Sequence, residues 1–202
     1  MRVGVLALQG DYHAHHEKLA ELGASPLFVR NPRELEGVSA LVLPGGESTT
    51  MLKLFTPEFV ASLQERVRQG MPVLATCAGV ILLAEGVENP AQESLGLLQV
   101  DVERNAYGRQ VDSFIAPELE LTETGRRLLT NLECLPKSQV PTFEGVFIRA
   151  PRITRTGPSA EVLATNGGTP VLVKQGNILG ATFHPELSEG KSMIHQLLLR
   201  LR

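Results

Sequence analysis

Cys77 is the residue whose type and setting point most directly to chemistry. An apolar run from Val73 to Ala75 precedes it, and a second apolar run begins at Val80. The first run predicts a short buried strand, and the second predicts the first turns of a helix. Cys77 would then lie on a tight strand-to-helix turn, where the helix N-terminus favours a thiolate. The alternative is an inert buried thiol, because free cysteine often packs as a small apolar residue.

A histidine and a carboxylate near the end of the chain could serve this thiol. The run from Ile178 to Phe183 predicts a buried strand, and His184, Pro185 and Glu186 follow it directly. Residues two apart in an extended chain point to the same side, so His184 and Glu186 can face together. A carboxylate beside an imidazole fixes its tautomer and stabilises the imidazolium. The alternative is a surface histidine that happens to lie next to a surface glutamate.

Acyl transfer by a thiol also needs donors for the oxyanion of a tetrahedral intermediate. The N–H of Ala78 follows the nucleophile directly and is one expected donor. Gly46 is the other, because the Gly45-Gly46 pair lets a backbone N–H turn into the site at little steric cost. Taken alone, this pair could equally form an ordinary turn. The predicted nucleophile, base, orienting group and oxyanion donors are Cys77, His184, Glu186, Gly46 and Ala78.

Alternating strands and helices are expected to position these residues in the first half of the chain. This pattern predicts a parallel sheet with helices on both faces. The loop at residues 44–48 and Cys77 both follow strands, and ligands of such sheets lie beyond the carboxyl ends of the strands. Strands are expected at residues 2–8, 25–29, 40–43 and 73–75, and helices at 12–22, 49–55 and 57–69.

The second half favours shorter strands in antiparallel or mixed pairing. We therefore expect an α/β fold: a three-layer sandwich with a mostly parallel central sheet, helices on both faces and a mixed or antiparallel C-terminal part. With 202 residues and no linker or repeat, residues 1–202 are expected to form one domain. The strands expected here are 98–103, 110–115, 145–150, 162–165, 171–175 and 178–183, followed by a helix at 192–199, and 131–141 is expected to be irregular.

Composition excludes several function classes. The net charge is −3 and the basic residues are scattered, so we expect no nucleic-acid partner. We expect no membrane association either, because no apolar run approaches the roughly 18 residues of a membrane span and no signal peptide is evident. Two cysteines, Cys77 and Cys134, do not make a disulfide framework, which indicates a reducing cytoplasm.

Three histidines on the first helix invite a metal interpretation. His13, His15 and His16 have no cluster of carboxylates or cysteines at ligand spacing, and an exposed polar helix face is expected instead. The chain also lacks a phosphate-cradling loop with a following Lys, so no sugar phosphate is expected to bind. We expect neither a metal nor a cofactor.

Several short motifs occur in order along residues 3–187. They are Leu8-Gln9-Gly10, Pro-Gly-Gly-Glu-Ser-Thr-Thr (44–50), Thr-Cys-Ala-Gly (76–79), Arg-Asn-Ala-Tyr-Gly-Arg-Gln (104–110), Phe-Ile-Arg-Ala-Pro (147–151) and Phe-His-Pro-Glu (183–186). Together they resemble the glutaminase subunits of pyridoxal 5′-phosphate synthase, which are triad-type (class I) glutamine amidotransferases. Ala75 departs from the Gly usual in that family, and residues from about Ser188 onward match no motif.

The resemblance implies hydrolysis of the L-glutamine side-chain amide to glutamate and ammonia through a cysteinyl thioester. Cys77 would attack, His184 would move the proton and Glu186 would orient His184. An arginine in the substrate pocket would suit the carboxylate of an amino acid, because its guanidinium can pair with it bidentately. By the same resemblance, the glutamine pocket would be lined by Gly46, Glu47, Ser48, Arg104, Ile148 and Arg149.

The resemblance also implies a partner. Ammonia would pass to a synthase subunit in a large hetero-oligomer that makes pyridoxal 5′-phosphate, and docking could turn the Gly46 amide into the oxyanion site. The helix after Gly10 is the expected docking surface. Two alternatives remain: the glutaminase subunit of histidine biosynthesis, and a different hydrolase with its cysteine on a similar turn.

Overall fold

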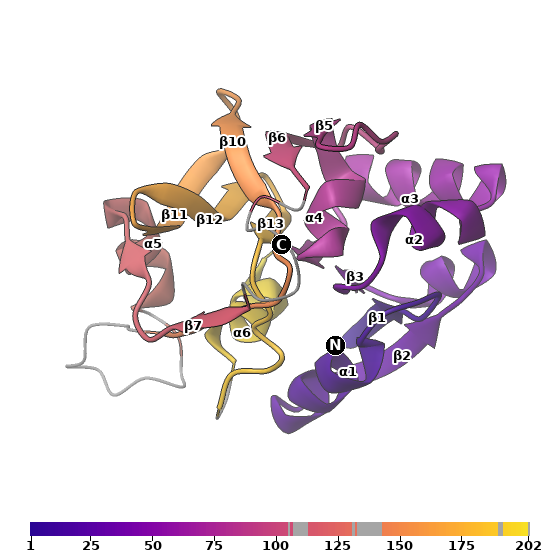
Figure 1. Ribbon diagram of the computed structural model, residues 1–202. Coiled ribbons are helices and arrows are strands. Elements are labelled where there is room, and N and C mark those ends of the chain that lie inside the picture. The colour runs from indigo at the N-terminus through magenta and orange to yellow at the C-terminus, as the bar shows by residue number, and fades with distance from the viewer. Residues whose placement is uncertain (105, 107–112, 131, 133–142, 190–191, 202) are drawn as a thin grey trace.

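An eight-stranded sheet forms the centre of the protein, with strand order β2-β1-β3-β4-β13-β12-β11-β8 (Figure 1). The computed structural model describes residues 1–104, 106, 113–130, 132, 143–189 and 192–201. The sheet strands are β1 (Arg2–Leu6), β2 (Ser25–Val29), β3 (Ala40–Leu43), β4 (Val73–Thr76), β8 (Glu120–Leu121), β11 (Glu161–Asn166), β12 (Thr169–Gln175) and β13 (Ile178–Ala181).

The parallel half of the sheet is the part that positions the site. Strands β2, β1, β3, β4 and β13 pair in parallel, so all of their carboxyl ends lie along one edge. Residues far apart in sequence meet there, because β3, β4 and β13 are neighbours. Beyond β13 the pairing becomes antiparallel through β12, β11 and β8.

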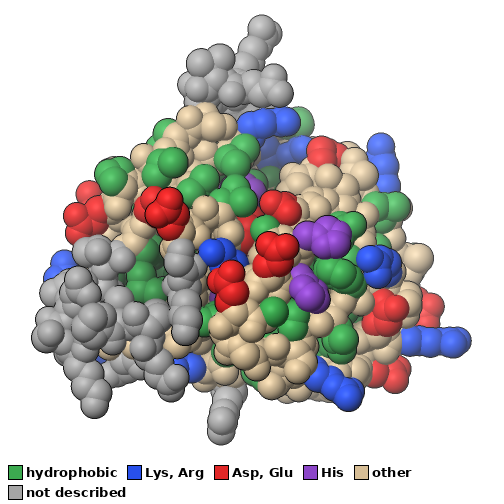
Figure 2. Space-filling view, turned by 90° about the horizontal axis from the view of Figure 1, so that it is seen from below, with side chains coloured by type: hydrophobic (Ala, Val, Ile, Leu, Met, Phe, Trp, Pro, Cys, Tyr) green, Lys and Arg blue, Asp and Glu red, His purple; other side chains and the backbone are tan. Residues whose placement is uncertain are grey.

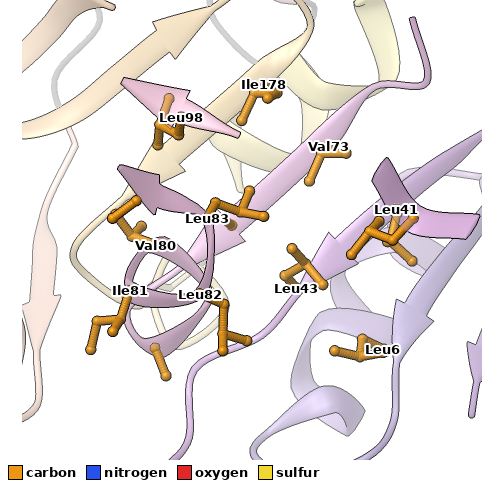
Figure 3. Packing of buried hydrophobic residues seen from close by; sticks show 14 of the residues in the cluster. Leu6, Leu41, Leu43, Val73, Val80, Ile81, Leu82, Leu83, Leu98 and Ile178 are labelled. Carbon is orange, nitrogen blue, oxygen red and sulfur yellow. The ribbon is translucent and has the colours of Figure 1, made fainter. Parts of the chain in front are cut away.

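Helices cover both faces of this sheet. One face carries η1 (Pro32–Gly37), α2 (Ser48–Leu54), α3 (Pro57–Arg68) and α4 (Ala78–Leu83), and the other carries α1 (Tyr12–Glu21), α5 (Glu123–Leu129) and α6 (Met193–Arg200). Alternate residues of β3 divide between the two hydrophobic cores: Leu41 and Leu43 join one, and Val42 joins the other. Figure 3 shows Leu43 and Val73 packing toward the side chains of α4. The predicted three-layer α/β fold is confirmed.

Two smaller sheets complete the structure. One has the order β10-β6-β5, from β10 (Arg152–Thr156), β6 (Leu98–Glu103) and β5 (Ala84–Glu88); the other pairs β7 (Phe114–Ala116) with β9 (Gly145–Phe147). In the first of these, β5 and β6 run parallel while β10 runs antiparallel. These sheets supply the mixed and antiparallel pairing predicted for the second half.

Several predicted boundaries were wrong. The strand expected at 178–183 ends at Ala181, and the strand expected at 145–150 ends at Phe147. The sequence interpretation missed η1, β5, β8, α5 and β10. β10 begins directly after Pro151, a residue that cannot donate to a sheet ladder and therefore predicts the boundary of a strand. Part of the strand expected at 110–115, and all of the irregular segment 131–141 except residue 132, lie outside the described residues.

No helix within the described ranges combines the length and apolar character needed to cross a bilayer.

Candidate active site

Cys77 lies at the junction predicted for it, between β4 and α4. Its backbone has φ 46° and ψ −106°, a strained combination for a residue with a side chain. Helix α4 begins at the next residue, and a Cβ on Gly79 would lie only 2.2 Å from the carbonyl oxygen of Leu43. Glycine at position 79 therefore lets the turn pack against β3 and holds the elbow in place.

His184 and Glu186 form the predicted pair, but not by the expected route. The Nδ1 atom of His184 is 2.7 Å from Oε1 of Glu186, and the glutamate is 3% exposed. These residues follow the end of β13 in a turn, in which the N–H of Leu187 donates to the carbonyl of His184 at 3.2 Å. The turn, rather than the two-residue repeat of an extended strand, brings the imidazole and the carboxylate together.

Cys77 and His184 face the same pocket. A methyl group placed on Gly45 would lie 2.5 Å from Cε1 of His184 and 3.3 Å from Cβ of Cys77, so both side chains border one point. The Nε2 atom of His184 is buried and has no hydrogen-bond partner within the described residues. Burial opposes protonation of His184, but electrostatic attraction to Cys77 and the hydrogen bond and charge of Glu186 outweigh it and raise the pKa of His184 to about 10.

The Gly45-Gly46 loop borders the thiol from the end of β3. A Cβ on Gly10 would lie 1.8 Å from the carbonyl oxygen of Gly45, so this carbonyl rests against Gly10. Because the N–H and C=O of a trans peptide point in opposite directions, the N–H of Gly46 points away from Gly10.

Ala78, the other predicted oxyanion donor, is the first residue of α4, so its N–H is among the donors that have no partner within the helix.

Glu47 caps α2, and its side chain organises the loop. The carboxylate accepts hydrogen bonds from the N–H of Thr49 at 3.2 Å and from the N–H of Thr50 at 2.7 Å. The Thr50 hydroxyl makes the largest contribution, and with the backbone donors it lowers the pKa of Glu47 to about 2. Arg104 approaches the same carboxylate at 3.5 Å and the Thr49 hydroxyl at 3.2 Å. The loop therefore holds a guanidinium at the pocket.

Ser48, Ile148 and Arg149, the remaining predicted pocket residues, also border this pocket. The Ser48 hydroxyl donates to Oε1 of Gln92 at 2.9 Å, and the carbonyl of Ile148 lies 3.9 Å from the sulfur of Cys77. Arg149 has φ 48°, which directs the chain sharply at the end of β9. The pocket has a volume of about 380 Å³, within the usual range of small-molecule sites.

Several residues at the site were not predicted from the sequence, among them Gln9 and His15, and Asp11, Ile81 and Leu187 also line the pocket. Gln9 lines the pocket, and its side-chain oxygen accepts a hydrogen bond from the N–H of Glu47 at 2.6 Å. Its place shortly after β1, which ends at Leu6 at the same edge of the sheet as Cys77, was the signal that could have found it. His15 lies 3.3 Å from the buried carboxylate of Glu186.

The expectation of an exposed histidine face on α1 was wrong for one of the three residues. His15 is fully buried, whereas His13 is exposed and His16 is half-buried beside Phe28. Histidine side chains do reach the surface in the space-filling view (Figure 2). The helix therefore turns its histidines in two directions, to solvent and to the interior. Cys134 lies outside the described residues.

The family model and two similar relatives assign this chain to the same family. The model of the SNO glutamine amidotransferase family matches residues 5–201. A protein named pyridoxal 5′-phosphate synthase subunit PdxT, from Thermotoga sp. (strain RQ2), is 49% identical over 190 residues, covering 94% of this chain and 93% of that protein. The protein of the same name from Koribacter versatilis is 47% identical and covers 100% and 95% of the two chains.

Solved structures agree with this fold. A structure described as a glutamine amidotransferase superimposes with a TM-score of 0.84 at 44% identity, covering 98% of this chain and 97% of that one. The structure of PurLQS from Thermotoga maritima gives a TM-score of 0.68 at 16% identity, over 98% and 97% of the chains, and supports the fold alone.

Proposed function

Because this chain belongs to the SNO glutamine amidotransferase family, we propose that it is the glutaminase subunit of a pyridoxal 5′-phosphate synthase. It would hydrolyse the side-chain amide of L-glutamine to glutamate and ammonia. The observation that carries this proposal is the pocket where Cys77 on its strained turn borders His184, which is itself bonded to Glu186 at 2.7 Å.

The chemistry proceeds through a thioester. His184 takes the thiol proton of Cys77, and the thiolate attacks the amide carbon of glutamine. The oxyanion that forms accepts hydrogen bonds from the N–H groups of Gly46 and Ala78. The imidazolium of His184 then donates its proton to the nitrogen that leaves as ammonia. His184 next activates a water molecule, which hydrolyses the thioester and releases glutamate.

Glutamine binding is assigned to the rim of the same pocket. The guanidinium of Arg104 pairs with the glutamine carboxylate, and Arg149 adds a second positive charge. Gly46, Ser48 and Ile148 line the pocket around the substrate. Glu47 acts through its cap on α2, because its carboxylate is already engaged by two backbone donors.

The ammonia passes to a synthase subunit in a hetero-oligomer, and the helix α1 is the proposed docking surface. Docking turns the N–H of Gly46 toward the oxyanion, which would make activity depend on the partner. Residues 1–202 act as one glutaminase domain in this proposal, located in the cytoplasm. The relatives that match nearly the whole chain carry the PdxT name, which favours this assignment over the glutaminase of histidine biosynthesis and over another cysteine hydrolase.

The proposal is tested by measuring the rate of ammonia release from glutamine with and without a pyridoxal 5′-phosphate synthase partner subunit. We expect a rate that rises when the partner is added and that is lost in Cys77→Ala. Cys134→Ala, which removes the other cysteine, is the matched control and should retain the rate. Equal ammonia release by Cys77→Ala would overturn the thioester mechanism, and hydrolysis of esters or peptides without glutaminase activity would favour the general hydrolase.

A further inference from the structure

A buried polar chain begins at Oε2 of Glu186, the carboxylate oxygen that does not bond to His184. His15 and His195 are fully buried, and Nδ1 of His15 is 2.7 Å from Nε2 of His195. The other nitrogen of His195, Nδ1, is 2.7 Å from the hydroxyl of Ser192. The other nitrogen of His15, Nε2, is 3.1 Å from the hydroxyl of Thr76 and 3.3 Å from Oε2 of Glu186.

Three separate elements supply the residues of this buried polar chain. His15 comes from α1, Thr76 ends β4 one residue before Cys77, and Ser192 and His195 come from the start of α6. The helices α1 and α6 lie on the same face of the sheet, where Leu19 and Ile194 belong to one hydrophobic core. The polar chain is therefore enclosed by apolar packing and connects the catalytic carboxylate to both helices.

Both histidines are neutral. Burial lowers the pKa of His15 well below its usual value, and electrostatic repulsion between a protonated His15 and the neighbouring His195 and His184 rings acts in the same direction. Burial also lowers the pKa of His195 to about 3, with a smaller contribution from Lys18. Each ring therefore carries one N–H and one acceptor nitrogen.

The carboxylate favours one arrangement of hydrogens on the two rings. Oε2 of Glu186 is buried and has no hydrogen-bond partner within the described residues, and an ionised carboxylate can only accept. A hydrogen on Nε2 of His15, which is 3.1 Å from the Thr76 hydroxyl and 3.3 Å from Oε2 of Glu186, keeps a nitrogen lone pair from facing this charge. With that tautomer, Nδ1 of His15 accepts from Nε2–H of His195, and Nδ1 of His195 accepts from the hydroxyl of Ser192.

We propose that His15 is a positioning residue that donates from Nε2 to Glu186 and holds this carboxylate ionised and aimed at His184. The proposal rests on the proposed glutaminase function, because its catalytic consequence is exerted through Glu186 and His184. A buried carboxylate without donors tends to take up a proton. A protonated Glu186 would no longer stabilise the imidazolium of His184.

The tautomer of His15 in the unmodified protein gives the first test. Nitrogen-15 chemical shifts and long-range proton–nitrogen couplings distinguish a ring protonated at Nε2 from one protonated at Nδ1. We expect Nε2–H on His15 at neutral pH. A His15 protonated at Nδ1, with its Nε2 lone pair facing Glu186, would overturn the proposal without any substitution being made.

Substitution gives the second test, with the pKa of His184 as the readout. In a Cys77→Ala background, His15→Leu should lower the pKa of His184 by about one pH unit or more, because Glu186 loses a charge-stabilising donor. His15→Gln, which restores an N–H donor near the Nε2 position, should recover most of that shift. His13→Leu, the same change at an exposed position of α1, should leave the pKa unchanged.

Enzyme kinetics complete the experiment in the complex with the synthase subunit. At saturating partner, His15→Leu in the otherwise unmodified chain should reduce kcat roughly ten- to hundredfold with little change in KM for glutamine, and His15→Gln should be less affected. A purely structural role for His15 would instead lower thermal stability and leave the pKa of His184 unmoved. The two proposals fail separately: a lack of glutaminase activity in the unmodified protein would refute the function, whereas the tautomer and the titration test His15 alone.

Discussion

Gly45→Ala offers the sharpest test of the geometry around the thiol. The added methyl would lie 2.5 Å from Cε1 of His184, 3.2 Å from its Nδ1 and 3.3 Å from Cβ of Cys77. Ordinary van der Waals contact for such a methyl is about 3.4–4 Å, so the imidazole must move by about 1 Å. Misplacement of a catalytic group by about 1 Å can cost on the order of a hundredfold in rate. We expect kcat to fall about a hundredfold.

The cost in stability should be much smaller than the cost in rate. Overpacking by one methyl group destabilises a protein by about 1–3 kcal/mol, which lowers Tm by about 2–12 °C in a chain of this size. Glutaminase activity with the partner present gives kcat, and differential scanning calorimetry gives Tm. The matched control is Gly37→Ala, because a Cβ there would have no neighbour within 4 Å. A folded Gly45→Ala protein with unchanged kcat would refute the placement of His184 and Cys77 around this loop.

Three further outcomes follow from the structure. Glu186→Gln should lower the pKa of His184 by about 1–2 pH units, measured by NMR titration, because it removes the charge 2.7 Å from Nδ1; an unchanged pKa would contradict the pairing. The free energy of unfolding of the unmodified protein should fall as pH drops from about 6.5 toward 3. Over this range the unfolded chain protonates His195, whereas burial keeps His195 neutral in the folded protein down to about pH 3. Urea titrations of His195→Gln should show a weaker dependence over that pH range, and an identical dependence would argue against the buried neutral imidazole. Gly79→Ala should destabilise by about 1–3 kcal/mol in chemical denaturation, because its Cβ would meet the Leu43 carbonyl oxygen at 2.2 Å; wild-type stability would refute the tight turn.

The parts of the fold that depend on long apolar runs could be predicted from the sequence. The strands that lead to Cys77 and to His184 are buried on both faces, so their composition shows them directly. Strand β5 could not be separated from the helix before it, because the apolar residues of α4 run into Ala84 without a breaker. The run alone does not distinguish a buried helix from a buried strand.

Site residues could be predicted from the sequence where the chemistry requires a particular residue type. They could not be predicted where the packing of a helix decides whether a side chain is buried. Glu186 could be paired with His184 from their spacing, although a turn rather than a strand achieves the pairing. His15 could not be placed, because a polar residue on a helix with little apolar periodicity is ordinarily exposed. Its position four residues before the buried Leu19 was the only local sign that it shares the inward face.

The backbone at Cys77 has an implication for the stability of the fold. A side chain at φ 46° carries a conformational cost that glycine would avoid, on the order of 1–3 kcal/mol. Relief of this strain by glycine would remove the side chain that the turn between β4 and α4 places at the pocket. The sequence therefore gives up some resistance to heat in order to hold a sulfur atom at this point of the pocket.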